Sequence, residues 1–142
     1  MMNQNLFLKI LFLFLTISIS SFAEEWEEIL NLKGYWKFNI GNDAEWSEYD
    51  YDDNDWEEIY VPSSWEDQGY YNYNGYAWYR KHFDFPSDIE SKVVYISLGY
   101  IDDVDEVYLN GKLVGSTGSF PPDFGTAYNA LRRYPVPKEL FY

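Results

Sequence analysis

Residues 98–115 read LGYIDDVDEVYLNGKLVG and contain the strongest hairpin signal in the sequence, Asn110-Gly111. A two-residue type I′ turn needs positive φ at both central positions, which Asn and Gly tolerate better than other residues. Apolar residues flank this pair on both sides, so we predict two antiparallel strands. In the simplest register Tyr108 pairs with Leu113 and Val107 pairs with Val114. The roles of Asn110 and Gly111 are therefore structural.

Four carboxylates precede the predicted turn, namely Asp102, Asp103, Asp105 and Glu106. Two carboxyl groups about 5–9 Å apart can hydrolyse a glycosidic bond, and such oxygens also bind Ca²⁺. The spacing does not match an EF-hand loop, and we instead predict that Arg80 pairs with Asp102 or Asp103 and locks two strands together. Asp105 would be costly if it were buried without a partner. Whether Asp102 and Asp103 also hold a structural calcium stays open, and no other cofactor is expected.

Several further segments have the short apolar runs and the punctuation of strands: residues 34–41, 56–62, 76–86 and 92–101. The last of them is almost continuously apolar, which predicts a strand buried on both faces. The tail ends in an extended piece at residues 133–137, and no final strand is visible. With 22% aromatic residues, the pattern predicts an all-β sandwich that lacks its last strand and has Trp56 and Trp78 in its core.

The first residues have the pattern of a secretory signal peptide, with Lys9, a short apolar run and small residues up to Ala23. We therefore divide the chain into a signal peptide, 1–23, and one domain, 24–142, the N-terminal part of a longer protein. Export to the periplasm or the extracellular space follows, without membrane insertion after cleavage. An uncleaved anchor is the minority alternative.

The composition narrows the class of partner. The chain has 10 basic and 24 acidic residues, a net charge of -14, which argues against nucleic acid as a partner because Lys and Arg must neutralise phosphates. There is no cysteine, and the single histidine, His82, lies inside an alternating strand, so the usual nucleophilic triads lack parts. No catalytic residue is assigned.

The best binding candidate is the aromatic segment WEDQGYYNYNGYAWYR at residues 65–80. Sugars present C–H faces that lie on aromatic rings, while amide and carboxylate groups bond their hydroxyls. The alternative is that these rings belong to the core and that Asn74-Gly75 only makes a turn. The candidate sugar contacts are Trp65, Tyr70, Tyr71, Tyr73 and Asn74.

In this order, five segments resemble a known family: LKGYWKFNIGND, YDDNDWEEIYVPSSWEDQG, YNGYAWYRKHFDFP, ISLGYIDDVDEVYLNGKLVGSTG and RRYPVPKEL. They are similar to the N-terminal sugar-binding domain of glycoside hydrolase family 2, the β-galactosidase and β-glucuronidase family. The same jelly roll occurs in sialate O-acetylesterases.

This resemblance implies a galactose-binding-like jelly roll that supports an adjacent catalytic domain, where the nucleophile and general acid of the family lie. No position of this chain matches those acids. In the family a loop of this domain reaches the active site, and its nearest equivalent is the shorter loop 73–76 with Asn74. The expected partners are a carbohydrate or that catalytic domain. Two alternatives are a ligand-sensing jelly roll of a bacterial membrane signalling protein, outside the cytoplasm, and a complete small lectin.

Overall fold

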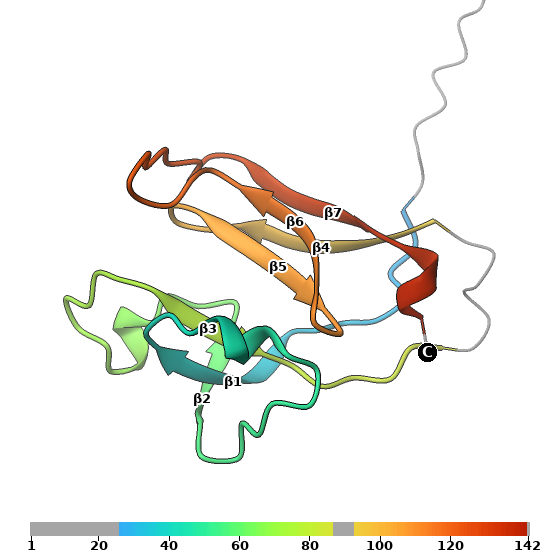
Figure 1. Cartoon of the computed structure of the whole chain (residues 1–142), viewed down its shortest axis with the longest axis horizontal. Helices are drawn as coiled ribbons and strands as arrows, with labels where there is room; N and C mark the ends of the chain where they lie inside the picture. The colour runs from blue at the N-terminus through green and yellow to red at the C-terminus, as the bar shows by residue number, and fades with distance from the viewer. Residues whose placement is uncertain (1–25, 87–92, 142) are drawn as a thin grey trace, which may run out of the picture.

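A computed structural model describes residues 26–86 and 93–141 of the chain (Figure 1). The predicted signal peptide at residues 1–23 lies outside them. None of the helices in these residues is long and apolar enough to span a membrane. The described part contains seven strands and three short 3₁₀ helices: β1 (Gly34–Ile40), η1 (Ala44–Ser47), β2 (Glu57–Val61), η2 (Glu66–Gln68), β3 (Ala77–Arg80), β4 (Val94–Tyr100), β5 (Asp105–Leu109), β6 (Lys112–Thr117), β7 (Leu131–Val136) and η3 (Lys138–Leu140).

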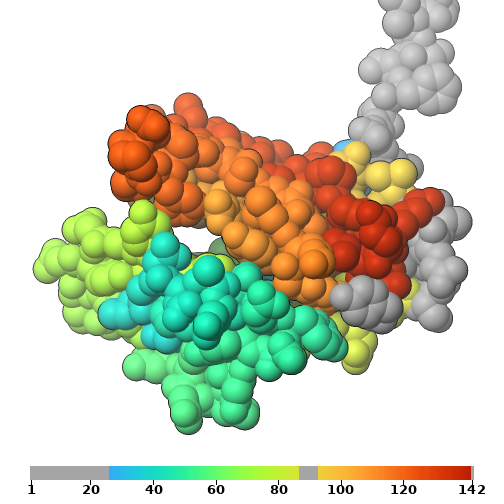
Figure 2. Space-filling view, in the orientation of Figure 1, coloured from blue at the N-terminus to red at the C-terminus, as the bar shows by residue number. Residues whose placement is uncertain are grey.

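The strands form two layers. The first is an antiparallel sheet with the order β2-β1-β3, and the second contains the antiparallel pairs β4-β7 and β5-β6, with β6 beside β7 (Figure 1). Figure 2 shows the β5–β6 hairpin against the segment around η1. Gly111 at the tip of the hairpin lies close to the backbone of Ser47 and Tyr49. The prediction of an all-β sandwich is confirmed.

The hairpin at residues 105–117 has the predicted turn and a different register. Asn110 and Gly111 have φ angles of 50° and 76°, and Tyr108 pairs with Leu113 as expected. Val107, however, pairs with Gly115 across a bulge, so the predicted pairing with Val114 is wrong. A Cβ atom at residue 115 would overlap the ring of Tyr134, and the bulge brings a glycine to this crowded position.

Strand β4 has one exposed face, and the prediction that it is buried on both faces is wrong. Val94 is buried, whereas Tyr95 and Ser97 are exposed. A bulge between Ser97 and Gly99 then shifts the register, so that Tyr100, 69% exposed, follows on the outer face. Three of the residues in this run are Tyr or Ser, whose hydroxyl groups tolerate water, and apolar content alone could not reveal that.

Strand β7 forms where the sequence showed only an extended piece. It pairs with β4 along its whole length, and Arg132, Tyr134 and Val136 alternate as buried residues with exposed neighbours. Pro135 has no N–H to donate, and it lies on a strand whose recorded hydrogen-bonded ladder is with β4 alone. Because a buried arginine occupies one of the inward positions, the hydropathy pattern of a strand was concealed.

The second layer holds a buried ion pair next to its apolar core. That core consists of Val94, Leu109, Val136 and Leu140. Beside it, Arg132 is fully buried, and its Nε donates to Oδ1 of Asp105 at 2.6 Å. The hydroxyl of Tyr134 donates to the other oxygen of Asp105 at 2.6 Å. The remaining guanidinium donors bond the carbonyl oxygens of residues 103, 127 and 130, so the buried charges are satisfied.

Arg132→Ala should leave the Asp105 carboxylate buried without its charged partner. We expect the free energy of unfolding to fall by about 3–5 kcal/mol, as for other broken buried pairs, measured by urea denaturation. Arg133→Ala is the matched control, since this neighbouring side chain is exposed and should cost about 1 kcal/mol or less. Equal losses in the two variants would contradict the assignment.

Candidate functional site

The aromatic loop between β2 and β3 packs mainly against the first sheet. Phe38 of β1 is only 1% exposed, and the ring centroids of Trp65 and Tyr70 lie 6.2 and 4.7 Å from its own. Tyr73 donates its hydroxyl to the carbonyl oxygen of Tyr76 at 2.7 Å. These three predicted sugar contacts therefore have partners within the fold. Each of the three side chains is still partly accessible to solvent.

The remaining two predicted contacts in this loop face solvent. Tyr71 is 75% exposed, and Asn74 is exposed with one weak internal hydrogen bond to the carbonyl of Asn72 at 3.4 Å. Tyr70, by contrast, donates to Glu57 at 2.8 Å, and its burial together with this hydrogen bond raises the pKa of Tyr70 to about 12. The structure thus brings Trp65, Tyr70 and Tyr73 together and holds Tyr71 and Asn74 apart from them; sugar contact by any of the five stays a prediction.

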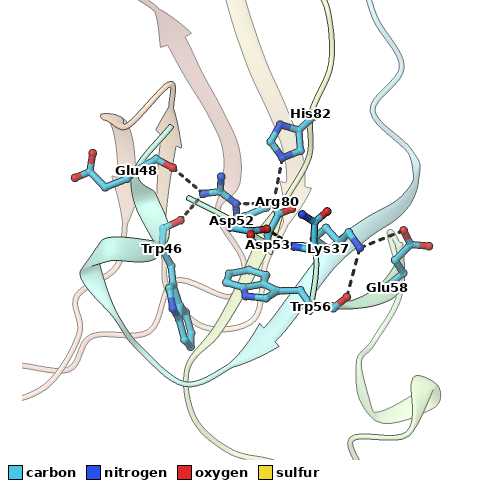
Figure 3. A network of polar contacts seen from close by, with 10 residues as sticks. Lys37, Trp46, Glu48, Asp52, Asp53, Trp56, Glu58, Arg80 and His82 are labelled. Atoms are coloured by element: carbon cyan, nitrogen blue, oxygen red, sulfur yellow. Dashed lines mark hydrogen bonds and ion pairs between the residues drawn. The ribbon is translucent and has the colours of Figure 1, made fainter. Parts of the chain in front are cut away.

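Arg80 of β3 binds the loop that contains η1 (Figure 3). Its Nε donates to Oδ2 of Asp53 at 2.8 Å, and its Nη1 donates to the carbonyl oxygens of Trp46 and Glu48. The predicted pairing of Arg80 with Asp102 or Asp103 is wrong. Arg80 lies opposite Lys37 in the first sheet, whereas those two acids precede β5 in the second layer.

Asp102 and Asp103 differ in their contacts. Asp102 is exposed. Asp103 accepts a hydrogen bond from the hydroxyl of Thr126 at 2.5 Å, and its carbonyl oxygen accepts from the amide of Ala127 and from Arg132. Within residues 26–86 and 93–141, no group of three or more His, Asp or Glu side chains is placed to hold a metal ion. Asp103 therefore contributes to the frame of the second layer.

Asp53 is a buried carboxylate that lies between the side chains of Arg80 and His82. His82 Nε2 lies 3.1 Å from the same oxygen that Arg80 contacts. Burial by itself raises the pKa of Asp53, but the hydrogen bonds to Arg80 and His82 outweigh it and hold the pKa below the ordinary value of 3.8. A carboxyl group of this kind stays ionised at neutral pH and cannot serve as a general acid.

The predicted core position is confirmed for Trp56, whereas Trp78 is only partly buried. The amide of Asn54 donates to Oδ1 of Asp52 at 3.1 Å in a tight turn, and Trp56 follows it into the core, 8% exposed. Trp78 stacks on Tyr108 of β5 with ring centroids 5.7 Å apart, so it joins the two layers. Both residues stabilise the sandwich.

A cavity of about 510 Å³ lies between the segment 26–33 and strand β4. Its apolar lining includes Trp36, Phe83 and Ile96, and the last two pack against the buried core of the second layer. Among the exposed side chains of its lining are Trp26, Tyr95, Tyr100 and Arg133. Ligand sites are typically apolar hollows of about 300–1,000 Å³ with a few polar groups, so we take this groove as the candidate binding site.

Sequence reasoning did not single out the exposed residues of this groove. Trp26 follows the predicted leader closely, Tyr95 and Tyr100 belong to a run that we read as buried, and Arg133 stands in a segment not recognised as a strand. The available signal was the Tyr95, Ser97 alternation, because a hydroxyl-bearing residue at every second position favours one wet face. The bulge that adds Tyr100 to that face had no such signal.

Comparison with known proteins gives a partial likeness to glycosidases. No family model matches the chain. A β-glucuronidase of Formosa agariphila is 32% identical over 104 residues, which cover 63% of this chain and 11% of that enzyme. A putative β-glucuronidase of the same organism is 32% identical over 97 residues, which cover 60% of this chain and 9% of that protein. The chain thus spans only about a tenth of the length of these relatives, and its likeness is to one part of them.

Asp53→Asn should remove the charge that Arg80 and His82 hold. Because the folded pKa of Asp53 is lowered, its contribution is present above the ordinary value and is lost as the pH falls through the folded value. We expect Asp53→Asn to lower the free energy of unfolding by about 1–3 kcal/mol at neutral pH. In urea denaturation at several pH values, this difference from the wild type should shrink below pH 3.8.

Asp52→Asn is the matched control for that series. It removes an adjacent exposed carboxylate but keeps an oxygen that can accept the turn hydrogen bond from the amide of Asn54. We expect a small change that varies little with pH. The assignment fails if the two variants show parallel pH profiles.

Proposed function

We propose that this chain is a non-catalytic carbohydrate-binding module of an exported glycoside hydrolase of family 2, and that it supports a catalytic domain outside this chain. The observation that carries the proposal is the 32% identity to two β-glucuronidases over 63% and 60% of the chain but only 11% and 9% of their length. A likeness of this extent fits one β-sandwich of a much larger enzyme. The jelly roll of the family and the leader at residues 1–23 are parts of the same proposal.

The state of the carboxyl groups supports a non-catalytic role. A glycosidase needs a carboxylic acid with a raised pKa next to a second carboxylate. Hydrogen bonds hold the pKa values of Asp53 and Glu66 below their ordinary values. Both carboxylate oxygens of Asp105 accept hydrogen bonds, one from Arg132 and one from Tyr134. Asp53 and Asp105 thus have structural roles.

The groove beside β4 supports the binding part of the proposal. Trp26 is 47% exposed and meets Tyr95 edge to face, with ring centroids 5.1 Å apart. Exposed rings above an apolar hollow give the C–H faces of a sugar a surface to cover, while nearby polar groups are free to bond its hydroxyls. The groove is a larger and more apolar surface than Tyr71 and Asn74 offer in the loop.

The purified chain should bind oligosaccharides without cleaving them. We expect no release of nitrophenol from 4-nitrophenyl β-glucuronide, and weak binding of β-1,4-linked oligosaccharides in calorimetric titration. Trp26→Ala should weaken this binding about two- to tenfold, since one stacked ring contributes about 0.5–1.5 kcal/mol. Tyr71→Ala is the matched control, because it removes an exposed aromatic ring from the loop and not from the groove.

Two results would overturn this proposal. One is glucuronide hydrolysis that stays with the purified chain. The other is the absence of binding to every oligosaccharide tested. If Tyr71→Ala weakens binding and Trp26→Ala does not, the module binds sugar through the loop, and the groove is the wrong site.

A further inference from the structure

Arg133 differs from the other two arginines of the sequence in its partner. Arg80 is bonded to Asp53, and Arg132 is bonded to Asp105. The guanidinium of Arg133 lies instead over the ring of Trp26, 4.3 Å from its centroid. No ion pair is recorded for it with any residue in 26–86 or 93–141. Arg133 is thus an exposed guanidinium that has an aromatic partner and no carboxylate partner among the described residues.

The backbone of the second layer places this guanidinium among exposed rings. In the β4-β7 ladder Arg133 lies opposite Ser97, and Tyr95 lies opposite Pro135. Because residues 132, 134 and 136 point inward, Arg133 is displayed on the outer face next to the edge-to-face pair of Trp26 and Tyr95. Trp26, Tyr95 and Arg133 also line the groove.

The contact between the Arg133 guanidinium and the Trp26 ring, with Cζ 4.3 Å from the ring centroid, is a cation–π contact and does not itself use the N–H donors of Arg133. A guanidinium carries five N–H donors that lie in its own plane. Those donors match the two oxygens of a carboxylate, which they bind with two parallel hydrogen bonds. A carboxylate that approaches along this plane would bring whatever carries it against the exposed edges of Trp26 and Tyr95.

The groove is also less acidic than the chain as a whole. Its charged lining residues are Glu27, Glu28, Lys33 and Arg133, two acids and two bases, whereas the chain carries a net charge of -14. Glu28 already accepts a hydrogen bond from Asn31. An anionic ligand would meet a locally balanced surface here, with the guanidinium at its exposed side.

We propose that Trp26, Tyr95 and Arg133 form a binding site for a uronic acid residue of an acidic glycan. The sugar carboxylate bonds the guanidinium of Arg133, and the C–H face of the sugar covers the aromatic rings. This inference rests on the proposed carbohydrate-binding function and adds to it the chemical class of the sugar. The structural alternative is that Arg133 only fastens the segment 26–33 to β7.

The test compares two ligands that differ in one group. A β-1,4-glucuronan tetrasaccharide and cellotetraose share their linkage and length, and they differ only in a carboxylate or a hydroxymethyl group at C5 of each ring. We expect the wild-type chain to bind the glucuronan more tightly in calorimetric titration. Arg133→Gln should weaken glucuronan binding by about tenfold or more, the range for a charge-assisted bond, and should leave cellotetraose binding nearly unchanged.

Two variants separate the guanidinium from its charge. Arg133→Lys keeps the charge without the planar fork and should restore only part of the preference. Lys112→Gln removes one exposed positive charge at the start of β6, a residue that does not line the groove, and should leave both affinities unchanged.

The outcomes distinguish this inference from the proposed function. Equal affinity of the wild type for both tetrasaccharides overturns the uronate site and leaves the binding module standing. An equal loss in Arg133→Gln and Lys112→Gln shows an effect of net charge and overturns it too. Loss of both ligands in Arg133→Gln together with a lower melting temperature supports the structural alternative and rejects the site. If the wild type binds neither sugar, both proposals fall.

Discussion

The buried pair of Arg132 and Asp105 determines how the second layer faces its surroundings. Arg132 is fully buried and all of its recorded partners lie within the protein. A shift of β7 by one residue would expose this charge pair and bury Arg133, at a cost of several kcal/mol. The pair therefore fixes the register of β7, and with it the side chains that the outer face shows. Arg133 is exposed beside Trp26 because the side chain of the adjacent residue, Arg132, is buried.

A second arginine–aspartate pair performs a comparable task in the first layer. Arg80 and Asp53 join β3 to the loop that contains η1, and Trp56 enters the core directly after that loop. In each layer one arginine–aspartate pair thus holds an irregular segment in place. The arginine of each pair also donates hydrogen bonds to backbone carbonyl oxygens. In a chain without cysteine, such pairs and the aromatic contacts between the layers take over part of the role that disulfides have in many small secreted domains.

The sequence predicted the features that depend on neighbouring residues. The turn at Asn110 follows from local backbone chemistry, and the strand at residues 34–41 follows from a short apolar run bounded by glycines. The partner of Arg80 could not be predicted, because Asp53, Asp102 and Asp103 all lie far from it in sequence and only the packing of the layers selects one. Strand β7 was missed because its inward arginine contradicts the hydropathy rule, and the outer face of β4 was missed because tyrosine suits both core and surface.

Under the proposed function, the candidate groove would contribute to the specificity of the enzyme to which the module belongs. A weak site is sufficient when it is tethered to a catalytic domain, because the linked domain meets the bound glycan at a high effective concentration. Affinity from the rings is similar for many sugars, since every pyranose has a C–H face. Discrimination must come from a group that pairs with one substituent, and on this face that group is the guanidinium of Arg133. A carboxylate ligand would satisfy donors of Arg133 that form no ion pair with an acidic side chain of the described residues, and selectivity would then arise from this hydrogen-bonding capacity.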